Sequence, residues 1–130
     1  MKIYILLALC LLMALPADAA TANFQGNCLP PVPGVPTDCV FDATRTPMGG
    51  IPTACPGSAI RRYFWDFGDG TSTFATPPPP WITHTYTSPI TTWVYLTVFC
   101  NDGTSATNRH CFSNQIAIAG CVIPGAGWTP

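Results

Sequence analysis

The sequence predicts an all-β protein with the architecture of a small β-sandwich, on the basis of three observations. Short segments rich in β-branched and aromatic residues alternate with proline- and glycine-rich turns. No stretch has a helical repeat. The chain of 130 residues is long enough for one such domain.

Residues 1–22 have the pattern of a secretory signal peptide. Lys2 precedes an apolar run over 3–15, and small residues follow in an A-x-A pattern, which predicts cleavage after Ala19 or after Ala22. The alternative is a retained membrane anchor, but a run of about 13 residues is shorter than the ~20 that span a bilayer. We therefore expect a secreted, extracellular or cell-surface protein with no membrane span after cleavage.

The chain beyond the leader carries little charge. The sequence has five Lys and Arg residues and six Asp and Glu residues; Lys2 and Asp18 fall in the leader, so four arginines and five aspartates remain. Such a surface lacks the basic footprint of a protein that binds nucleic acid. It also lacks the charge repulsion that keeps domains apart in solution, which favours association with a partner.

Proline, glycine and β-branched residues predict the order of the elements. Residues 23–38 hold four prolines and are expected to form an extended N-terminal arm, because proline has no N–H to donate to a sheet. A domain follows over 39–118, and 119–130 form a short C-terminal arm. Pro77 to Pro80 is expected to be a polyproline bridge between two sheets. Strands are predicted over 39–43, 60–67, 83–87, 92–100 and 106–118.

The stretch 63–71, YFWDFGDGT, is the strongest local pattern. Alternation places Tyr63, Trp65 and Phe67 on one face, where large rings can fill a core. Aspartates can then accept backbone hydrogen bonds in the turn, while glycines adopt its positive φ angles. A catalytic aspartate pair is the alternative, but capping a turn is the usual role of aspartates beside glycines. The residues with a predicted structural role are Tyr63, Trp65, Asp66, Phe67, Gly68, Asp69 and Gly70.

Together with three further motifs in the same order, this stretch resembles the polycystic-kidney-disease (PKD) domain, an immunoglobulin-like β-sandwich of extracellular proteins. The motifs are Val40-Phe41-Asp42-Ala43, His84-Thr85-Tyr86, and the alternating Val94 to Val98 followed by Asn101-Asp102-Gly103. The resemblance covers roughly 39–118. It implies an immunoglobulin-like fold in which His84 and Tyr86 belong to the structural signature.

Some PKD domains bind calcium through acidic residues that include a D-G turn after the first strand. The corresponding residues here, 46–50, contain no carboxylate. Asp42 and Asp66 alone would supply few of the oxygen ligands that calcium requires. We therefore expect no cofactor and no metal.

Six cysteines in an exported chain predict three disulfides. Metal ligation is the alternative, but no two cysteines have C-x-x-C spacing. Cys100 and Cys111 flank the predicted last hairpin and are expected to pair across it. Three pairings are open for the other four cysteines, of which we favour Cys39 with Cys55 and Cys28 with Cys121.

No catalytic constellation is present in the sequence. It contains neither a G-x-S-x-G elbow nor an H-E-x-x-H motif, and no glycine-rich phosphate loop leads into a helix. We therefore expect that the protein is not an enzyme.

The candidate binding site is an aromatic row that points away from the core. Alternation in 93–100 sends Val94, Leu96 and Val98 inward and the aromatic residues between them outward. The PKD topology implies that the signature strand lies beside this one. If Cys111 faces inward to meet Cys100, the residues on either side of it face outward. The predicted aromatic face is then Arg62, Phe64, Trp93, Tyr95, Phe99 and Phe112.

An exposed aromatic face indicates an interaction surface. The favoured hypothesis is a self-associating or adhesive cell-surface component, held in a homo-oligomer or filament by protein–protein contacts. The alternative is a carbohydrate-binding module whose rings stack on a polysaccharide, with Arg62 as the clearest polar side chain beside them. A third interpretation is that the chain's own arms, including Trp128, cover the face.

Overall fold

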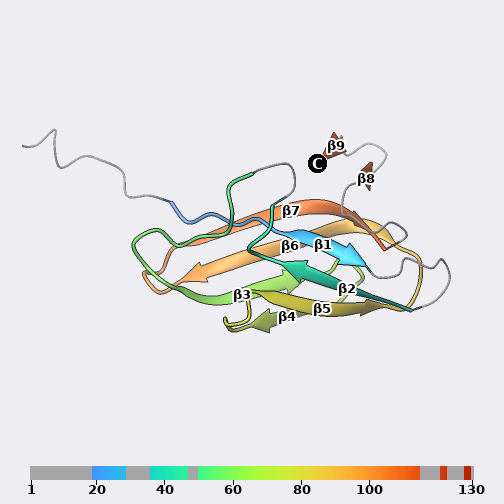
Figure 1. Ribbon diagram of the computed structural model, residues 1–130, viewed down its shortest axis with the longest axis horizontal. Coiled ribbons are helices and arrows are strands. Elements are labelled where there is room, and N and C mark those ends of the chain that lie inside the picture. Colours follow the sequence, from blue (N-terminus) through green and yellow to red (C-terminus); the bar gives the residue numbers. More distant parts are fainter. Residues whose placement is uncertain (1–18, 29–35, 47–49, 115–120, 123–127, 130) are drawn as a thin grey trace, which may run out of the picture.

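The computed structural model describes residues 19–28, 36–46, 50–114, 121–122 and 128–129, the last two pairs by their backbone alone. The described strands form two antiparallel sheets that enclose a common core, and no helix occurs among the described residues (Figure 1). The protein is therefore the all-β sandwich that its sequence predicts.

The first sheet has the strand order β1-β2-β5 and the second β4-β3-β6-β7. The strands of the first sheet are β1 (Gln25–Cys28), β2 (Thr37–Asp42) and β5 (Trp81–Tyr86). Those of the second are β3 (Ile60–Asp66), β4 (Ser72–Ala75), β6 (Thr91–Cys100) and β7 (Ser105–Ser113). A separate antiparallel pair is formed by β8 (Cys121–Val122) and β9 (Trp128–Thr129).

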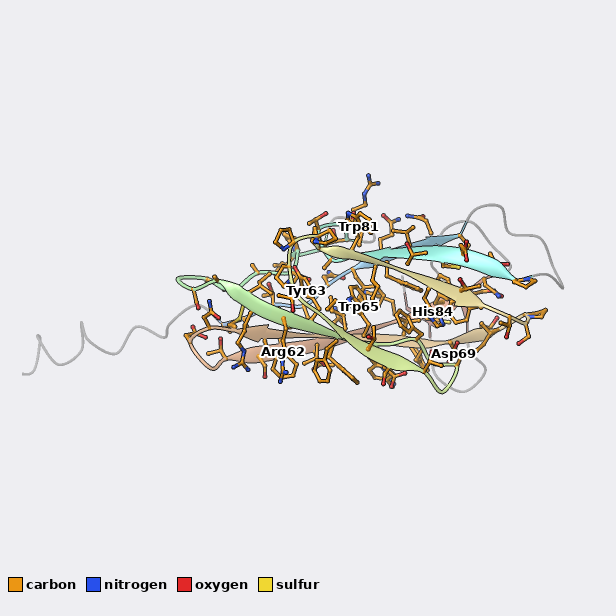
Figure 2. The ribbon with its side chains drawn as sticks, turned by 90° about the horizontal axis from the view of Figure 1, so that it is seen from below. Arg62, Tyr63, Trp65, Asp69, Trp81 and His84 are labelled. Atoms are coloured by element: carbon orange, nitrogen blue, oxygen red, sulfur yellow. A yellow bond between two sulfur atoms is a disulfide. The ribbon has the colours of Figure 1, made fainter. Side chains whose placement is uncertain are left out.

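The core is filled by rings that alternate residues of the strands send between the sheets. Trp65 is fully buried and lies 5.3 Å from Phe24 and 6.0 Å from Phe41, measured between ring centroids. Figure 2 shows Tyr63 and Trp65 between the two sheets and Arg62 on the outer side of one of them. Burial of each such ring contributes about 1.5–3 kcal/mol, so a few large side chains can stabilise a small domain.

The signature turn after β3 is capped as the sequence predicts. The backbone N–H of Gly68 donates to Asp66 Oδ1 at 3.0 Å, and that of Thr71 donates to Asp69 Oδ1 at 3.0 Å. Gly68 has φ of 76°, a conformation that other residues rarely adopt. A Cβ at Gly68 would also collide with the carbonyl oxygen of Trp93. Glycine is therefore required here both by the turn and by the close approach of β6.

The five predicted strands correspond to β2, β3, β5, β6 and β7, and the part of the last prediction over 115–118 lies outside the described residues. Of the strands in the two sheets, β1 and β4 are not predicted, because each has only four residues and their sequences, QGNC and STFA, show no alternation of apolar and polar residues. The two-residue strands β8 and β9 are not predicted either. Pro77 to Pro80 carries the chain from the second sheet to the first through a series of bends. The expected crossing between sheets is confirmed.

The prediction that 23–38 form an arm is wrong for 23–28 and for Thr37 and Asp38, which are the first residues of β2. Phe24 is fully buried in the core, and β1 pairs with β2 so that Gly26 lies opposite Phe41. All four prolines lie over 30–36, so they leave the backbone N–H groups of β1 free to join the sheet. Residues 29–35 lie outside the described part of the chain, as does most of the expected C-terminal arm.

The three expected disulfide pairings are wrong. Cys28 is bonded to Cys39, and Cys55 is bonded to Cys100. The first bond joins residues that lie opposite each other in β1 and β2, and the pairing of these strands was not expected. Because Cys100 is bonded to Cys55, it cannot pair with Cys111. Cys111 is itself disulfide-bonded, while the Cys121 side chain lies outside the described residues.

Disulfides that staple a small domain are typical of extracellular proteins. In the part of the chain that the structure describes, no helix is long and apolar enough to cross a membrane. The leader predicted over 1–22 falls within the described residues only from residue 19 onward.

Candidate interaction surface

The outer side of the second sheet carries an array of aromatic rings with two arginines, which we call the arginine–aromatic face. Its residues occupy the alternate positions of each strand that do not enter the core. They are Arg62 and Phe64 on β3, Phe74 on β4, Trp93, Tyr95 and Phe99 on β6, and Arg109 on β7. Neighbouring strands therefore bring residues that are far apart in the sequence to one surface.

Arg62 lies between two rings of this face. Its guanidinium carbon is 4.5 Å from the centre of the Phe74 ring and 5.0 Å from that of Phe99. Phe64 extends the cluster, since its ring is 4.9 Å from that of Phe74. Phe74 is 56% exposed, so the cluster opens to solvent. Each cation–π contact of this kind contributes about 0.5–1 kcal/mol at an exposed site.

The Arg62 cation has no counter-charge among the described residues. Its Nε atom is buried and has no hydrogen-bond partner, and the ion pairs in the described part of the chain involve other residues. The stacked rings hold the side chain in place without neutralising it. An arginine fixed in this way can receive a carboxylate or another acceptor from outside with little further ordering.

A second arginine covers the other end of the face. The guanidinium carbon of Arg109 is 4.3 Å from the centre of the Trp93 ring, and its Nη1 donates to the Tyr95 hydroxyl at 3.4 Å. Arginine therefore lies over the rings of Trp93, Phe74 and Phe99. These ring faces are less open to a flat ligand than bare aromatic side chains would be.

Five of the six residues predicted for the aromatic face lie on it: Arg62, Phe64, Trp93, Tyr95 and Phe99. The placement of Phe112 is wrong. Its side chain is 1% exposed and lies in the core, 4.9 Å from the Phe41 ring and 5.5 Å from the Tyr86 ring. The expectation rested on a bond between Cys111 and Cys100. In the structure Cys111 lies opposite Trp93 on the outer side, which turns Phe112 inward.

Two residues of the face were not predicted. Phe74 lies on the short β4, where it pairs directly with Phe64. Arg109 lies opposite Tyr95, on the side of β7 that was taken for the inner one. Phe74 has a recognisable signal, the segment Ser72 to Ala75 after a glycine turn, but a strand of four residues is too short to identify by alternation. Arg109 could be placed only with the correct register of β7.

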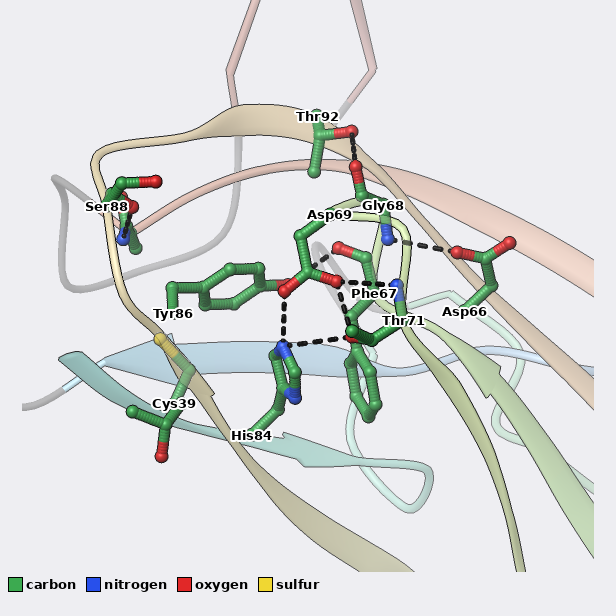
Figure 3. Close-up of polar contacts among 12 residues, drawn as sticks. Cys39, Asp66, Phe67, Gly68, Asp69, Thr71, His84, Tyr86, Ser88 and Thr92 are labelled. Atoms are coloured by element: carbon green, nitrogen blue, oxygen red, sulfur yellow. Dashed lines mark hydrogen bonds and ion pairs between the residues drawn. The ribbon is translucent and has the colours of Figure 1, made fainter. Parts of the chain in front are cut away.

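The signature residues form a hydrogen-bonded cluster in which Phe67 and Tyr86 are buried and His84 and Asp69 are partly exposed. His84 stacks on Phe67 with ring centroids 3.9 Å apart, and its Nε2 lies 2.8 Å from Asp69 Oδ2 (Figure 3). The carboxylate can only accept, so Nε2 carries the hydrogen. The Tyr86 hydroxyl donates to the carbonyl of Phe67 at 2.8 Å. These contacts tie the turn after β3 to β5 in the opposite sheet.

Burial and hydrogen bonds perturb two groups of this cluster. Burial raises the pKa of Tyr86 far above its usual value, with a smaller contribution from Asp69. Burial alone would also raise the pKa of the Asp69 carboxyl, but hydrogen bonds from Thr71 and His84 hold it below its usual value. Both shifts follow from contacts that hold the fold together, so they do not mark a catalytic group.

The described residues do not fit a metal site. No group of three or more histidine, cysteine, aspartate or glutamate side chains among them is placed to hold a metal ion. Asp42 and Asp66 lie in different sheets, and each is already an acceptor: Asp42 for Thr44 and Asp66 for Gly68. Nothing in the arrangement of these two carboxylates brings them to a common ion.

Comparison with known protein families shows that the PKD domain model matches residues 29–113 of the chain. No match was found among curated proteins. Among solved structures, one similar chain comes from a study of the promiscuous specificity of carbohydrate-binding modules from the β-sandwich superfamily. It is 29% identical with a TM-score of 0.60, over 76% of this chain but only 35% of that one. With the family match extending over every strand from β2 to β7, the chain belongs to the PKD domain family.

Proposed function

We propose that the protein is a secreted, non-catalytic interaction module that self-associates at the cell surface through the arginine–aromatic face. The family suggests an extracellular interaction module, and PKD domains are generally non-catalytic. The observation that carries the proposal is the Arg62 cluster, in which a cation without a counter-charge among the described residues is held between Phe74 and Phe99.

The composition of the face suits contact with a protein. Interface centres are enriched in tyrosine, tryptophan, phenylalanine and arginine, and most of the binding energy comes from a few such residues. The low charge of the chain opposes association little. A secreted domain with an open apolar surface and few repelling charges is therefore suited to assembly.

The second candidate function is binding to a polysaccharide. It is favoured by the similar solved structure, which comes from a study of carbohydrate-binding modules. That chain is much longer than the part matched here, so the likeness does not assign the binding activity to this domain. The arginines over Trp93 and over the Phe74 and Phe99 rings also leave less ring surface for a sugar to stack on.

The test is sedimentation equilibrium of the oxidised mature protein over a concentration series, with two matched variants. Phe74→Ser removes a 56% exposed ring from the face, and Ile51→Ser removes a 70% exposed side chain elsewhere. We expect Phe74→Ser to weaken self-association about tenfold or more, which corresponds to ~1.4 kcal/mol, and Ile51→Ser to leave it unchanged.

The proposal would be wrong if the wild type stayed monomeric at every concentration, or if both variants associated like the wild type. A monomer that is retarded in a gel containing a soluble polysaccharide would support the second candidate instead.

A further inference from the structure

We propose that the self-association is head to tail, so that the arginine–aromatic face of one copy docks on the outer side of the first sheet of the next copy. This inference rests on the proposed function and adds the identity of the second surface. We call that surface the acidic face and define it by Asp38, Val40, Asp42 and Trp81, on the outer side of β2 and β5.

The acidic face is open and partly apolar. Trp81 is 49% exposed and Val40 is 40% exposed, and Trp81 lies directly opposite Asp42 in the neighbouring strand. Figure 2 shows Trp81 on the outer side of its sheet, away from Arg62 on the outer side of the other. A shallow cleft of about 280 Å³ is lined by Asn27, Asp38, Val40, Asp42 and Arg45. It could accept a protruding side chain such as Phe74 from a second copy.

Both carboxylates of this face are oriented by neighbours rather than buried. Asp38 Oδ1 accepts a hydrogen bond from the Thr85 hydroxyl. Asp42 Oδ1 accepts from the N–H and the hydroxyl of Thr44, and its Oδ2 lies 3.5 Å from the Nε of Arg45, whose side chain is 67% exposed. Asp38 has no ion-pair partner among the described residues. The outer side of the first sheet thus carries Asp38 and Asp42 with Arg45 beside them. The outer side of the second carries Arg62 and Arg109 with Asp66 opposite Tyr95, so the two sides differ in the sign of their net charge.

The charges decide between a face-to-face contact of two arginine–aromatic faces and a head-to-tail contact of that face with the acidic face. If two arginine–aromatic faces met, Arg62 and Arg109 of one copy would approach the same cations of the other, and like charges in an interface disfavour binding. If that face meets the acidic face, Asp38 and Asp42 can supply the carboxylates that Arg62 and Arg109 lack. Such a contact is heterologous, and it repeats from copy to copy into a ring or a filament.

The smaller face limits the strength of the contact. Three strands spaced about 4.8 Å apart and about 20 Å long cover roughly 300 Å² in projection. A stable interface buries about 800 Å² per partner. We therefore expect a weak, salt-sensitive association that is detected at high protein concentration.

The experiment impairs each face separately and then mixes the two variants. Arg109→Glu alters the arginine–aromatic face and Asp38→Arg alters the acidic face, and both side chains are exposed. Arg61→Glu, at the exposed bulge of β3, is the control for net charge, because no ring contact involves it among the described residues. Arg62→Glu serves as a second variant of the first face.

In sedimentation velocity and native mass spectrometry, we expect the Arg109→Glu and Asp38→Arg proteins each to self-associate at least tenfold more weakly than the wild type. A one-to-one mixture should associate through contacts between the two variants and more strongly than either variant alone, because one intact pair of faces remains and the two altered faces carry opposite charges at positions 109 and 38. The Arg61→Glu protein should behave as the wild type.

Other outcomes separate this inference from the proposed function. If Asp38→Arg associates as the wild type while Arg109→Glu and Arg62→Glu do not, the arginine–aromatic face is an interface but the head-to-tail arrangement is wrong. If the mixture forms no mixed dimer, the arrangement is also wrong. If the wild type is monomeric throughout, both proposals fail. If the protein is a monomer that binds a polysaccharide, and Trp81→Ala abolishes that binding, the acidic face is a sugar-binding surface instead.

Discussion

At the scale of single residues, Asp69 and His84 show how the signature turn is held against the opposite sheet. The Asp69 carboxylate accepts hydrogen bonds from the backbone N–H and the hydroxyl of Thr71, and another from His84 of β5. His84 in turn lies flat on Phe67. Two polar residues of the sequence motif thus complete one packed unit, although they are 15 residues apart in the sequence.

This unit predicts how stability depends on pH. The folded-state pKa of Asp69 is lowered, so the carboxylate adds stability that is fully present above its unfolded pKa and is lost as the pH falls through the folded pKa. Between about pH 5 and pH 2, we expect the melting temperature of the wild type to fall more than that of Asp69→Asn. Calorimetry or circular dichroism of both proteins across this range would measure it. Parallel curves would contradict a lowered pKa of Asp69 in the folded state.

At the scale of elements, β6 could be interpreted from its sequence and β7 could not. In β6 the alternation identifies the inner face, because Val94, Leu96 and Val98 are aliphatic and no polar residue interrupts their series. In β7 the inner positions are held by Asn108 and His110, which bond to the segment before β1. Polar residues on an inner face mask the alternation. The direction of Phe112 then depended on a disulfide that does not form.

The orientation of β7 predicts a difference between two phenylalanines. Phe112→Ala should lower the free energy of unfolding by about 3–5 kcal/mol, because it opens a cavity beside Phe41 and Tyr86. Phe74→Ala should lower it by about 1 kcal/mol or less, since it removes an exposed ring and its contact with Arg62. Urea unfolding of the oxidised proteins would measure both. Equal losses would contradict the orientation of β7.

At the scale of the whole molecule, the residues just before β1 belong to the sandwich. Thr21 exchanges two backbone hydrogen bonds with Ala54, both of 3.0 Å, and the carbonyl of Ala22 accepts from the Asn108 amide at 3.0 Å. Ala22 is itself part of the core. Of the two cleavage positions that the A-x-A pattern allows, the later one would remove these contacts.

We therefore expect the leader to be cleaved after Ala19, so that the mature chain begins at Ala20. Intact mass and N-terminal sequencing of the protein after expression of the full chain in a host that exports it would test this. A chain that begins at Asn23 should unfold at a lower temperature than one that begins at Ala20, because it loses the pairing with Ala54 and the burial of Ala22. A mature protein that begins at Asn23 would show that these contacts are not needed.

The sequence by itself determined the sandwich, the signature turn and five strands, because these depend on local patterns: alternation over a long strand, and aspartate and glycine in a tight turn. Only the tertiary structure decided the disulfide partners, the inward direction of Phe112 and the presence of Phe74 and Arg109 beside the other aromatic residues. These depend on which strands pair and in which register. A shift of one residue in register exchanges the inner and outer faces of a strand, and a short strand does not carry enough alternation to determine it.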